Sequence, residues 1–178
     1  MDLPKRKPTR LKNYNYSSDG YYFVTICTKK KCKILCDIVV GGGALDAPYS
    51  ALDAPYSALD APYIHLSKIG QIVERYILST NNISGITVDK YVIMPNHIHL
   101  ILCVKNNNGT PRASSPTNNA ISSAIAVLKR FVNNELGHNI FQRSFYDHII
   151  RNEKDYHRIC EYIKNNPAKW KEDKFYIK

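Results

Sequence analysis

Four stretches of the chain have the hydrophobic composition or the alternation of a strand. The stretch YYFVTICTK is rich in aromatic and β-branched residues, and ITVDKYVIMP alternates apolar with polar side chains. The pair Pro95-Asn96 separates two of these stretches, so we expect either a tight reversal there or one long strand with a kink. The predicted strands are residues 21–29, 86–95, 97–105 and 141–150, with a shorter extended piece at 32–40.

Three further stretches have the spacing of amphipathic helices. In LSKIGQIVERYILST the apolar residues recur every three or four positions, and the same spacing is found in AISSAIAVLKRFVNNELG. Gly137 is placed to end the second helix, while Asn152 and Pro167 bracket the third. The predicted helices are residues 66–80, 120–137 and 154–166.

The order of these elements is β, α, β, β, α, β, α. Two strands joined by a short turn and flanked by helices match the ferredoxin-like split βαβ arrangement. We therefore expect an α+β fold, in which an antiparallel sheet carries helices on one face and a further helix closes the chain.

A tandem repeat, ALDAPYSALDAPYSALDAPY, interrupts this pattern at residues 44–63. Each unit contains a proline, which would break a continuous helix, and a seven-residue unit is too short to bury a face in a solenoid. A longer surface loop costs little closure entropy, so the repeat is interpreted as an expanded loop. The prediction is one domain over residues 1–178, with low-complexity insertions at 41–63 and 106–119.

The composition indicates a globular protein that meets a polyanion. The chain has 25 Lys and Arg against 15 Asp and Glu, a formal net charge of +10, which favours a nucleic-acid partner. No apolar run approaches the roughly 18 residues that span a bilayer, and the basic N-terminus lacks the apolar stretch of a secretory signal. We expect a cytoplasmic protein with no membrane partner and reduced cysteines.

The stretch PNHIHLIL places two histidines two positions apart on a predicted strand. His97 and His99 then share one face, while Ile98, Leu100 and Leu102 share the opposite face and can pack against helices. Two neutral imidazoles side by side are potential metal ligands. By themselves, they are equally compatible with two histidines on an exposed sheet face.

The last predicted helix has two distinct sides. An apolar stripe consists of Tyr156, Ile159, Cys160 and Ile163. Tyr162 lies off this stripe and shares another side with Asn166, four residues later. A tyrosine and an amide on that side can meet a facing sheet, although a surface tyrosine would show the same pattern.

Together these motifs resemble the single-tyrosine HUH transposases, and most closely their REP-associated tyrosine transposase branch. The resemblance rests on PNHIHLIL, on FQRSFYDHIIR at 141–151 and on EYIKNNPAKW after it. It covers the chain from Tyr21 to about Trp170, apart from the two low-complexity loops.

The resemblance implies a metal-dependent transposase or nickase of single-stranded DNA, with hairpin repeats as the expected target. His97, His99 and Asn166 would bind Mg²⁺ or Mn²⁺, with Asn166 standing where many relatives have glutamine. Tyr162 would be the nucleophile and would form a 5′-phosphotyrosine intermediate. The enzyme would be a monomer or a homodimer, and the tyrosine would serve its own subunit or the partner's.

Several basic residues are expected to contact DNA phosphates, with aromatic residues interleaved. They are Lys5, Arg6, Lys7, Arg10, Lys29, Lys30, Lys31, Lys129 and Arg130.

Other assignments remain open at the level of sequence. The chain could be a non-catalytic nucleic-acid-binding module derived from a transposase. A metal-dependent hydrolase would need a further carboxylate, for which Asp89 and Asp147 are available. Tyr156 is a competing nucleophile, and His148 and His157 are further candidate ligands.

Overall fold

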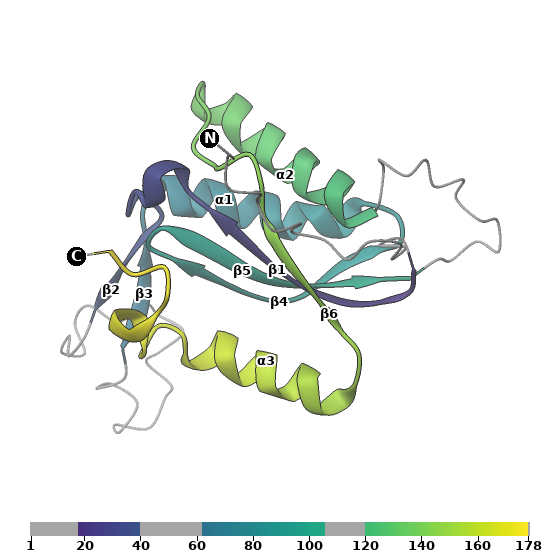
Figure 1. Cartoon of the computed structure of the whole chain (residues 1–178). Coiled ribbons are helices and arrows are strands. Elements are labelled where there is room, and N and C mark those ends of the chain that lie inside the picture. Colours follow the sequence, from purple (N-terminus) through teal and green to yellow (C-terminus); the bar gives the residue numbers. More distant parts are fainter. Residues whose placement is uncertain (1–17, 40–61, 106–119, 178) are drawn as a thin grey trace, which may run out of the picture.

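In the computed structural model, residues 18–39, 62–105 and 120–177 are described, and their main element is a four-stranded antiparallel sheet (Figure 1). The strand order in the sheet is β4-β5-β1-β6, and β2 and β3 form a separate two-stranded sheet. The strands are β1 (Gly20–Cys27), β2 (Cys36–Val39), β3 (Tyr63–Leu66), β4 (Ile86–Met94), β5 (His97–Val104) and β6 (Tyr146–Ile150). The helices are α1 (Lys68–Ser79), α2 (Ala120–Leu136) and α3 (Glu153–Asn165), with short 3₁₀ turns η1 (Lys29–Lys31), η4 (Thr80–Asn82) and η5 (Trp170–Glu172).

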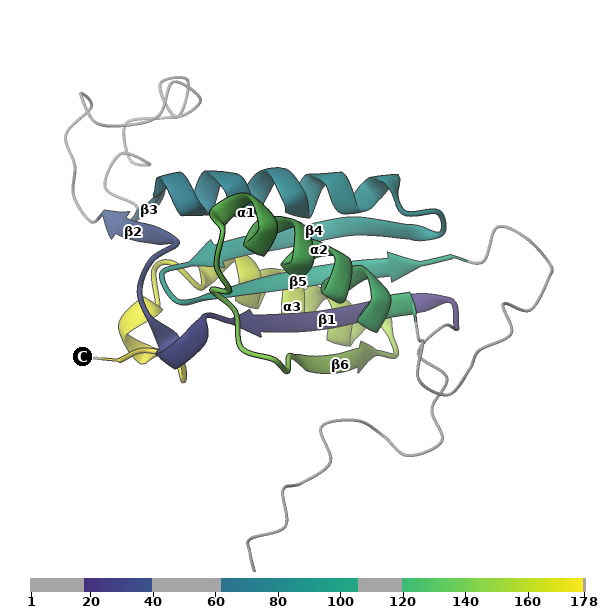
Figure 2. The ribbon, with the colours of Figure 1, turned by 90° about the horizontal axis from the view of Figure 1, so that it is seen from above.

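The helices cover both faces of the main sheet. Helices α1 and α2 lie on one face and α3 lies on the other, as Figures 1 and 2 show from two directions. In chain order, β1, α1, β4, β5, α2 and β6 form the split βαβ arrangement with an antiparallel sheet. The expected α+β fold, with two helices on one face and the tyrosine-bearing helix in addition, is therefore confirmed.

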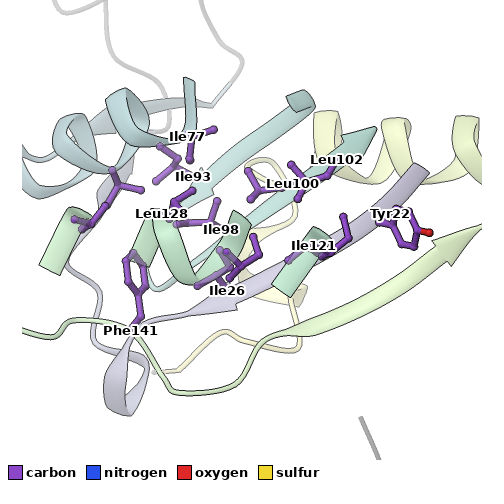
Figure 3. Packing of buried hydrophobic residues seen from close by; sticks show 14 of the residues in the cluster. Tyr22, Ile26, Ile77, Ile93, Ile98, Leu100, Leu102, Ile121, Leu128 and Phe141 are labelled. Carbon is purple, nitrogen blue, oxygen red and sulfur yellow. The ribbon is translucent and has the colours of Figure 1, made fainter. Parts of the chain in front are cut away.

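Side chains of β5 divide between two hydrophobic clusters, because successive residues of a strand point to opposite faces. Ile98, Leu100 and Leu102 belong to the larger cluster beneath α1 and α2, where they are fully buried (Figure 3). Ile101 points the other way and packs with Ile159 of α3 in the smaller cluster. A fully buried aliphatic side chain of this kind contributes roughly 1.5–3 kcal/mol.

The turn between β4 and β5 is a tight reversal, the first of the two possibilities that the sequence left open. Met94 pairs with His97 across a two-residue connection formed by Pro95 and Asn96. The carbonyl of Asn96 accepts hydrogen bonds from the backbone N–H and the hydroxyl of Thr28, both at 3.0 Å. This turn therefore holds the start of β5 against the end of β1.

Helix ends follow the signals in the sequence. The hydroxyl of Ser67 accepts a hydrogen bond from the backbone of Gly70 at the start of α1, and the side chain of Asn152 accepts one from Asp155 at the start of α3. Gly137 follows the last residue of α2 with φ of +71°, a conformation in which a Cβ would be strained.

The boundaries near the repeat differ from the prediction. The extended piece predicted at 32–40 contains a strand, β2, although only over Cys36–Val39. Leu66, predicted as the first residue of a helix, instead ends β3, which pairs with β2. Tyr63 therefore belongs to a strand and not to the insertion predicted at 41–63. Local periodicity missed this pairing because a strand of four residues at the edge of a long loop has too few alternations to stand out. The rest of both predicted insertions, apart from Pro62, lies outside the described residues.

The strand predicted at 141–150 is also shorter than expected. Phe141 forms an isolated bridge with Thr28, and continuous pairing with β1 begins only at Tyr146. Within the described ranges, no helix has both the length and the apolar character needed to cross a bilayer.

Candidate active site

The two histidines of β5 are enclosed by protein. His97 and His99 have no exposed surface, so they are not histidines on an open sheet face. Their Nε2 atoms lie 3.0 Å apart. In the tautomer that binds a metal, each Nε2 carries a lone pair, so two hydrogen-bond acceptors then face each other at close range. A shared cation or proton relieves the repulsion that such a pair would otherwise have.

The oxygen atoms beside the other two ring nitrogens are compatible with that tautomer. Nδ1 of His99 lies 2.8 Å from the hydroxyl of Thr25, its cross-strand neighbour on β1. Nδ1 of His97 lies 2.9 Å from the side-chain oxygen of Asn96. An Nδ1–H donated to each oxygen leaves both Nε2 lone pairs free, which is the usual arrangement of histidines that bind metals.

Burial also keeps the two imidazoles neutral. Desolvation lowers the pKa of His97 to about 4, and it lowers the pKa of His99 well below its usual value, with a smaller effect from neighbouring His97. Neutral rings are the form that coordinates a cation, so the pair is ready to bind metal across the neutral range.

Tyr162 reaches this pair from α3. The stripe predicted for that helix is confirmed, because Ile159 and Ile163 are buried and Tyr156 and Cys160 pack beside them. Tyr162 lies off the stripe and places its hydroxyl 3.2 Å from Nε2 of His99. Its ring meets that of Phe23 edge to face, at 6.1 Å between centroids. Burial and the nearby carboxylate of Asp173 raise the pKa of Tyr162 to about 12.

Asn166 occupies the position at which the helix ends. It is almost fully buried, and its side-chain NH₂ donates to Asp173 at 3.0 Å. Its side-chain oxygen is buried without a hydrogen-bond partner in the structure. A buried amide oxygen without a partner loses its hydration, and a cation ligand is one way to restore it.

Asp173 is a candidate site residue that the sequence did not indicate. Its carboxylate accepts a hydrogen bond from the Tyr162 hydroxyl at 3.0 Å, and one ligand atom from each of His97, His99 and Asp173 lies within 4.8 Å of the others. Among the residues that the structure describes, no other His, Cys, Asp or Glu side chains form such a group of three. The residues around Asp173 follow no helical or strand period, so no sequence pattern singled out this carboxylate.

These residues fit a divalent cation. One nitrogen of each imidazole lies within 4.8 Å of an Asp173 carboxylate oxygen, and the unpaired Asn166 oxygen belongs to the amide that donates to this carboxylate. Nitrogen and oxygen ligands without thiolates suit Mg²⁺ or Mn²⁺ more than structural zinc. The cluster can therefore hold a metal beside a tyrosine hydroxyl.

The other candidate residues lie elsewhere. The hydroxyl of Tyr156 donates to Asp89 at 2.7 Å, a bond that raises the pKa of the phenol and occupies one carboxylate considered for a hydrolase. His148 pairs with Asp155 at 2.7 Å, and His157 lies 3.5 Å from Glu153 on the exposed side of α3. These residues and Asp147 are not part of the group formed by the His pair and Asp173.

The predicted DNA-binding basic residues lie in different parts of the chain. Lys29 and Lys30 are exposed in η1, directly after β1, and Lys31 lies 5.5 Å from the centre of the Phe175 ring. Arg130 is exposed on α2. Lys5, Arg6, Lys7 and Arg10 lie outside the described residues.

Lys129 has a partner other than DNA. Its ammonium donates to the carbonyls of Gln142, Arg143 and Ser144 at 2.9–3.3 Å, and burial lowers its pKa to about 8. This geometry argues against the predicted phosphate contact, because the three N–H groups are used to fix the loop before β6.

Residues 63–166, more than half of the chain, match the family described as Transposase IS200 like. The chain belongs to the IS200-like transposase family. This match includes both histidines, Tyr162 and Asn166, and it confirms the resemblance to single-tyrosine HUH transposases. Asp173 lies beyond the matched residues.

Two proteins and one solved structure are similar to this chain. The transposase is 32% identical to an uncharacterized protein of Haemophilus influenzae over 97% of this chain and 93% of that one. It is 27% identical to the REP-associated tyrosine transposase of Escherichia coli over 56% of this chain and 54% of that protein. The solved structure of a REP-associated tyrosine transposase bound to a REP hairpin covers 96% of this chain and 74% of that one, with a TM-score of 0.58 and 20% identity, which supports the fold.

Proposed function

We propose that this transposase cleaves and rejoins single-stranded DNA through a covalent bond between Tyr162 and a 5′ phosphate. The observation that carries the proposal is the 3.2 Å distance between the Tyr162 hydroxyl and His99, one of two buried histidines with free Nε2 lone pairs. A nucleophile and a cation site in contact are what phosphoryl transfer to a side chain requires.

His97, His99 and the side-chain oxygen of Asn166 are the residues that would hold Mg²⁺ or Mn²⁺, with the carboxylate of Asp173 beside them. A bound cation would polarise a non-bridging oxygen of the scissile phosphate and offset the charge that develops there. Asparagine at 166 is one methylene shorter than glutamine. Its burial at the end of α3, beside Asp173, supports a ligand role in spite of that difference.

Tyr162 supplies the attacking oxygen. Its oxygen forms the new bond to phosphorus while the bond from phosphorus to the 3′ oxygen breaks, so the products are a 5′-phosphotyrosine and a free 3′ hydroxyl. Burial and Asp173 raise the pKa of the phenol to about 12, so the free protein keeps the phenol proton; in the overall reaction the 3′ oxygen gains a proton as the phenol loses one. The covalent bond conserves the energy of the phosphodiester, which allows rejoining.

The DNA substrate is proposed to be single-stranded or hairpin DNA. The similar REP-associated tyrosine transposase was solved bound to a REP hairpin, and this chain has a net charge of +10. The exposed lysines Lys29 and Lys30 follow directly on β1, beside the turn that starts β5, and can contact phosphates.

One subunit is proposed to contain the complete site. Tyr162 and His99 of the same chain are within hydrogen-bonding distance, so the tyrosine needs no partner subunit to reach the histidines.

The test is covalent trapping. Purified protein incubated with Mn²⁺ and a labelled hairpin with a single-stranded flank should give a protein–DNA adduct that survives denaturing electrophoresis. Tyr162→Phe should abolish the adduct and leave binding of the hairpin largely intact. Tyr156→Phe is the matched control, because it removes a phenol of the same helix that points to Asp89.

An adduct that persists in Tyr162→Phe and disappears in Tyr156→Phe would assign the nucleophile to Tyr156. Binding of DNA without any adduct from the wild-type protein would instead favour a nucleic-acid-binding module without catalysis.

A further inference from the structure

The carboxylate of Asp173 accepts three hydrogen bonds from the residues around it. Oδ2 accepts from the Tyr162 hydroxyl and from the side-chain NH₂ of Asn166, both at 3.0 Å. Oδ1 accepts from the backbone N–H of Phe175 at 2.6 Å. One side chain therefore contacts both the proposed nucleophile and the proposed amide ligand.

The segment that carries Asp173 is anchored to the histidine site. Phe175 is buried, and its ring centroid lies 4.7 Å from that of His97. Its carbonyl accepts a hydrogen bond from the side-chain NH₂ of Asn96 at 2.8 Å, and the oxygen of the same amide lies 2.9 Å from Nδ1 of His97. Asn96 thus links the orientation of His97 to the position of the segment after α3, which Figure 1 draws in yellow.

The hydrogen bond to Asp173 also decides which end of the Asn166 amide is free. A carboxylate accepts but does not donate, so it binds the NH₂ group and excludes the oxygen from that position. The oxygen is consequently the atom left buried and unpaired. Without Asp173, the amide could turn by half a rotation and present its NH₂ group, which no cation would accept as a ligand.

The same carboxylate restrains Tyr162. The phenol is 39% exposed, so packing against Phe23 covers only part of the ring. A charge-assisted hydrogen bond at the hydroxyl holds the end of the side chain that packing leaves free.

We propose that Asp173 is a positioning residue, which holds the Tyr162 hydroxyl beside the histidine pair and turns the Asn166 oxygen towards the bound cation. The inference rests on the proposed function. It adds the segment 170–176, which lies wholly beyond the part of the chain that matches the family, to the active site.

The test compares Asp173→Asn with Glu172→Gln, a matched control that removes the neighbouring exposed carboxylate. Asparagine has one acceptor oxygen where aspartate has two, so it cannot accept all three hydrogen bonds. We expect the rate of adduct formation at saturating hairpin to fall about tenfold or more in Asp173→Asn, since hydrogen bonds to charged groups are among the stronger ones. The KM for the hairpin and the thermal midpoint should change little, and Glu172→Gln should behave as wild type.

A second measurement does not depend on activity. Binding of Mn²⁺ alone is measured by electron paramagnetic resonance in wild type, Asp173→Asn, Asn166→Ala and the double variant. If Asp173 acts on the metal through Asn166, Asp173→Asn weakens Mn²⁺ binding in the wild-type background and has no further effect in Asn166→Ala. An equal loss in both backgrounds would make Asp173 a direct ligand and would overturn the positioning role.

An adduct rate in Asp173→Asn equal to that of the wild type would also overturn the inference. Absence of any adduct from the wild type would refute the proposed function instead, and the Mn²⁺ series would still decide the role of Asp173 towards Asn166.

Discussion

The hydroxyl of Tyr162 lies 3.2 Å from Nε2 of His99, although 63 positions of the chain separate the two residues. The contact arises because β5 presents its histidines to one face of the sheet and α3 packs on that same face through Ile159 and Ile163. The apolar stripe of α3 therefore sets the direction in which Tyr162 points.

Thr25 should be required for tight metal binding. Its hydroxyl lies 2.8 Å from Nδ1 of His99, and Thr25→Val keeps the shape of the side chain while it removes this oxygen. Loss of such a hydrogen bond to a metal-binding histidine typically weakens metal affinity about 10- to 100-fold. Isothermal titration with Mn²⁺ measures the change, and Thr87→Val, on the exposed part of β4, serves as the control. Unchanged affinity in Thr25→Val would argue against His99 as a ligand.

The metal-free protein should lose stability as the pH falls from about 6.5 to about 4. Burial lowers the pKa of His97 to about 4 from a usual value of 6.5, so in this window the unfolded chain binds a proton that the folded chain does not. Above pH 6.5 the ring is neutral in both the folded and the unfolded chain, so the free energy of unfolding has its full value. Below that pH, the free energy of unfolding should drop by about 1.4 kcal/mol per pH unit for each such histidine.

Urea denaturation with a chelator, repeated between pH 7.5 and pH 4.5, measures this dependence. His97→Gln should reduce the slope because it removes one of the two buried rings. His138→Gln, which changes an exposed histidine, should leave the slope unchanged. A free energy of unfolding that is flat over this range would contradict burial of neutral histidines.

The basic turn after β1 should contribute to DNA binding in a way that depends on salt. Lys29 and Lys30 are exposed next to the site, and each phosphate contact to single-stranded DNA adds about 0.7 to the slope of log K against log salt concentration. Substitution of both by glutamine should therefore reduce the magnitude of the slope by about 1.4. Fluorescence anisotropy with a labelled hairpin at several salt concentrations tests this expectation. Lys105→Gln, beyond the far end of β5, is the control, and equal slopes for the two variants would exclude the turn from the DNA surface.

Removal of one repeat unit, residues 51–57, should leave the enzyme folded and active. The repeat lies between β2 and β3, which are held together by antiparallel pairing from Cys36 with Leu66 to Val39 with Tyr63. A shorter connection between paired strands changes the closure entropy by less than about 1 kcal/mol. Thermal unfolding and adduct formation should both match the wild type. A lower adduct yield at an unchanged thermal midpoint would instead give the repeat a role in the reaction.

The local sequence pattern was sufficient to predict which way the side chains of β5 and α3 face. Alternation along 97–105 placed both histidines on one side and Ile98, Leu100 and Leu102 on the other, and the structure has the same division. Spacing along 154–166 separated Tyr162 from the buried stripe in the same way. Both predictions succeeded because strand and helix periods are properties of the backbone, so the facing of a side chain follows from its position in the element.

Tertiary structure decided the contacts between segments that no local sequence period predicts. Asp173 follows α3 in a segment without regular spacing, and only the packing of Phe175 and its hydrogen bond to Asn96 bring the carboxylate to Tyr162. Folding likewise directed Lys129 to three carbonyls of a distant loop and paired β2 with β3 across the repeat. Contacts of this kind depend on which elements lie side by side, and that arrangement is set by burial of the whole core and not by neighbours along the chain.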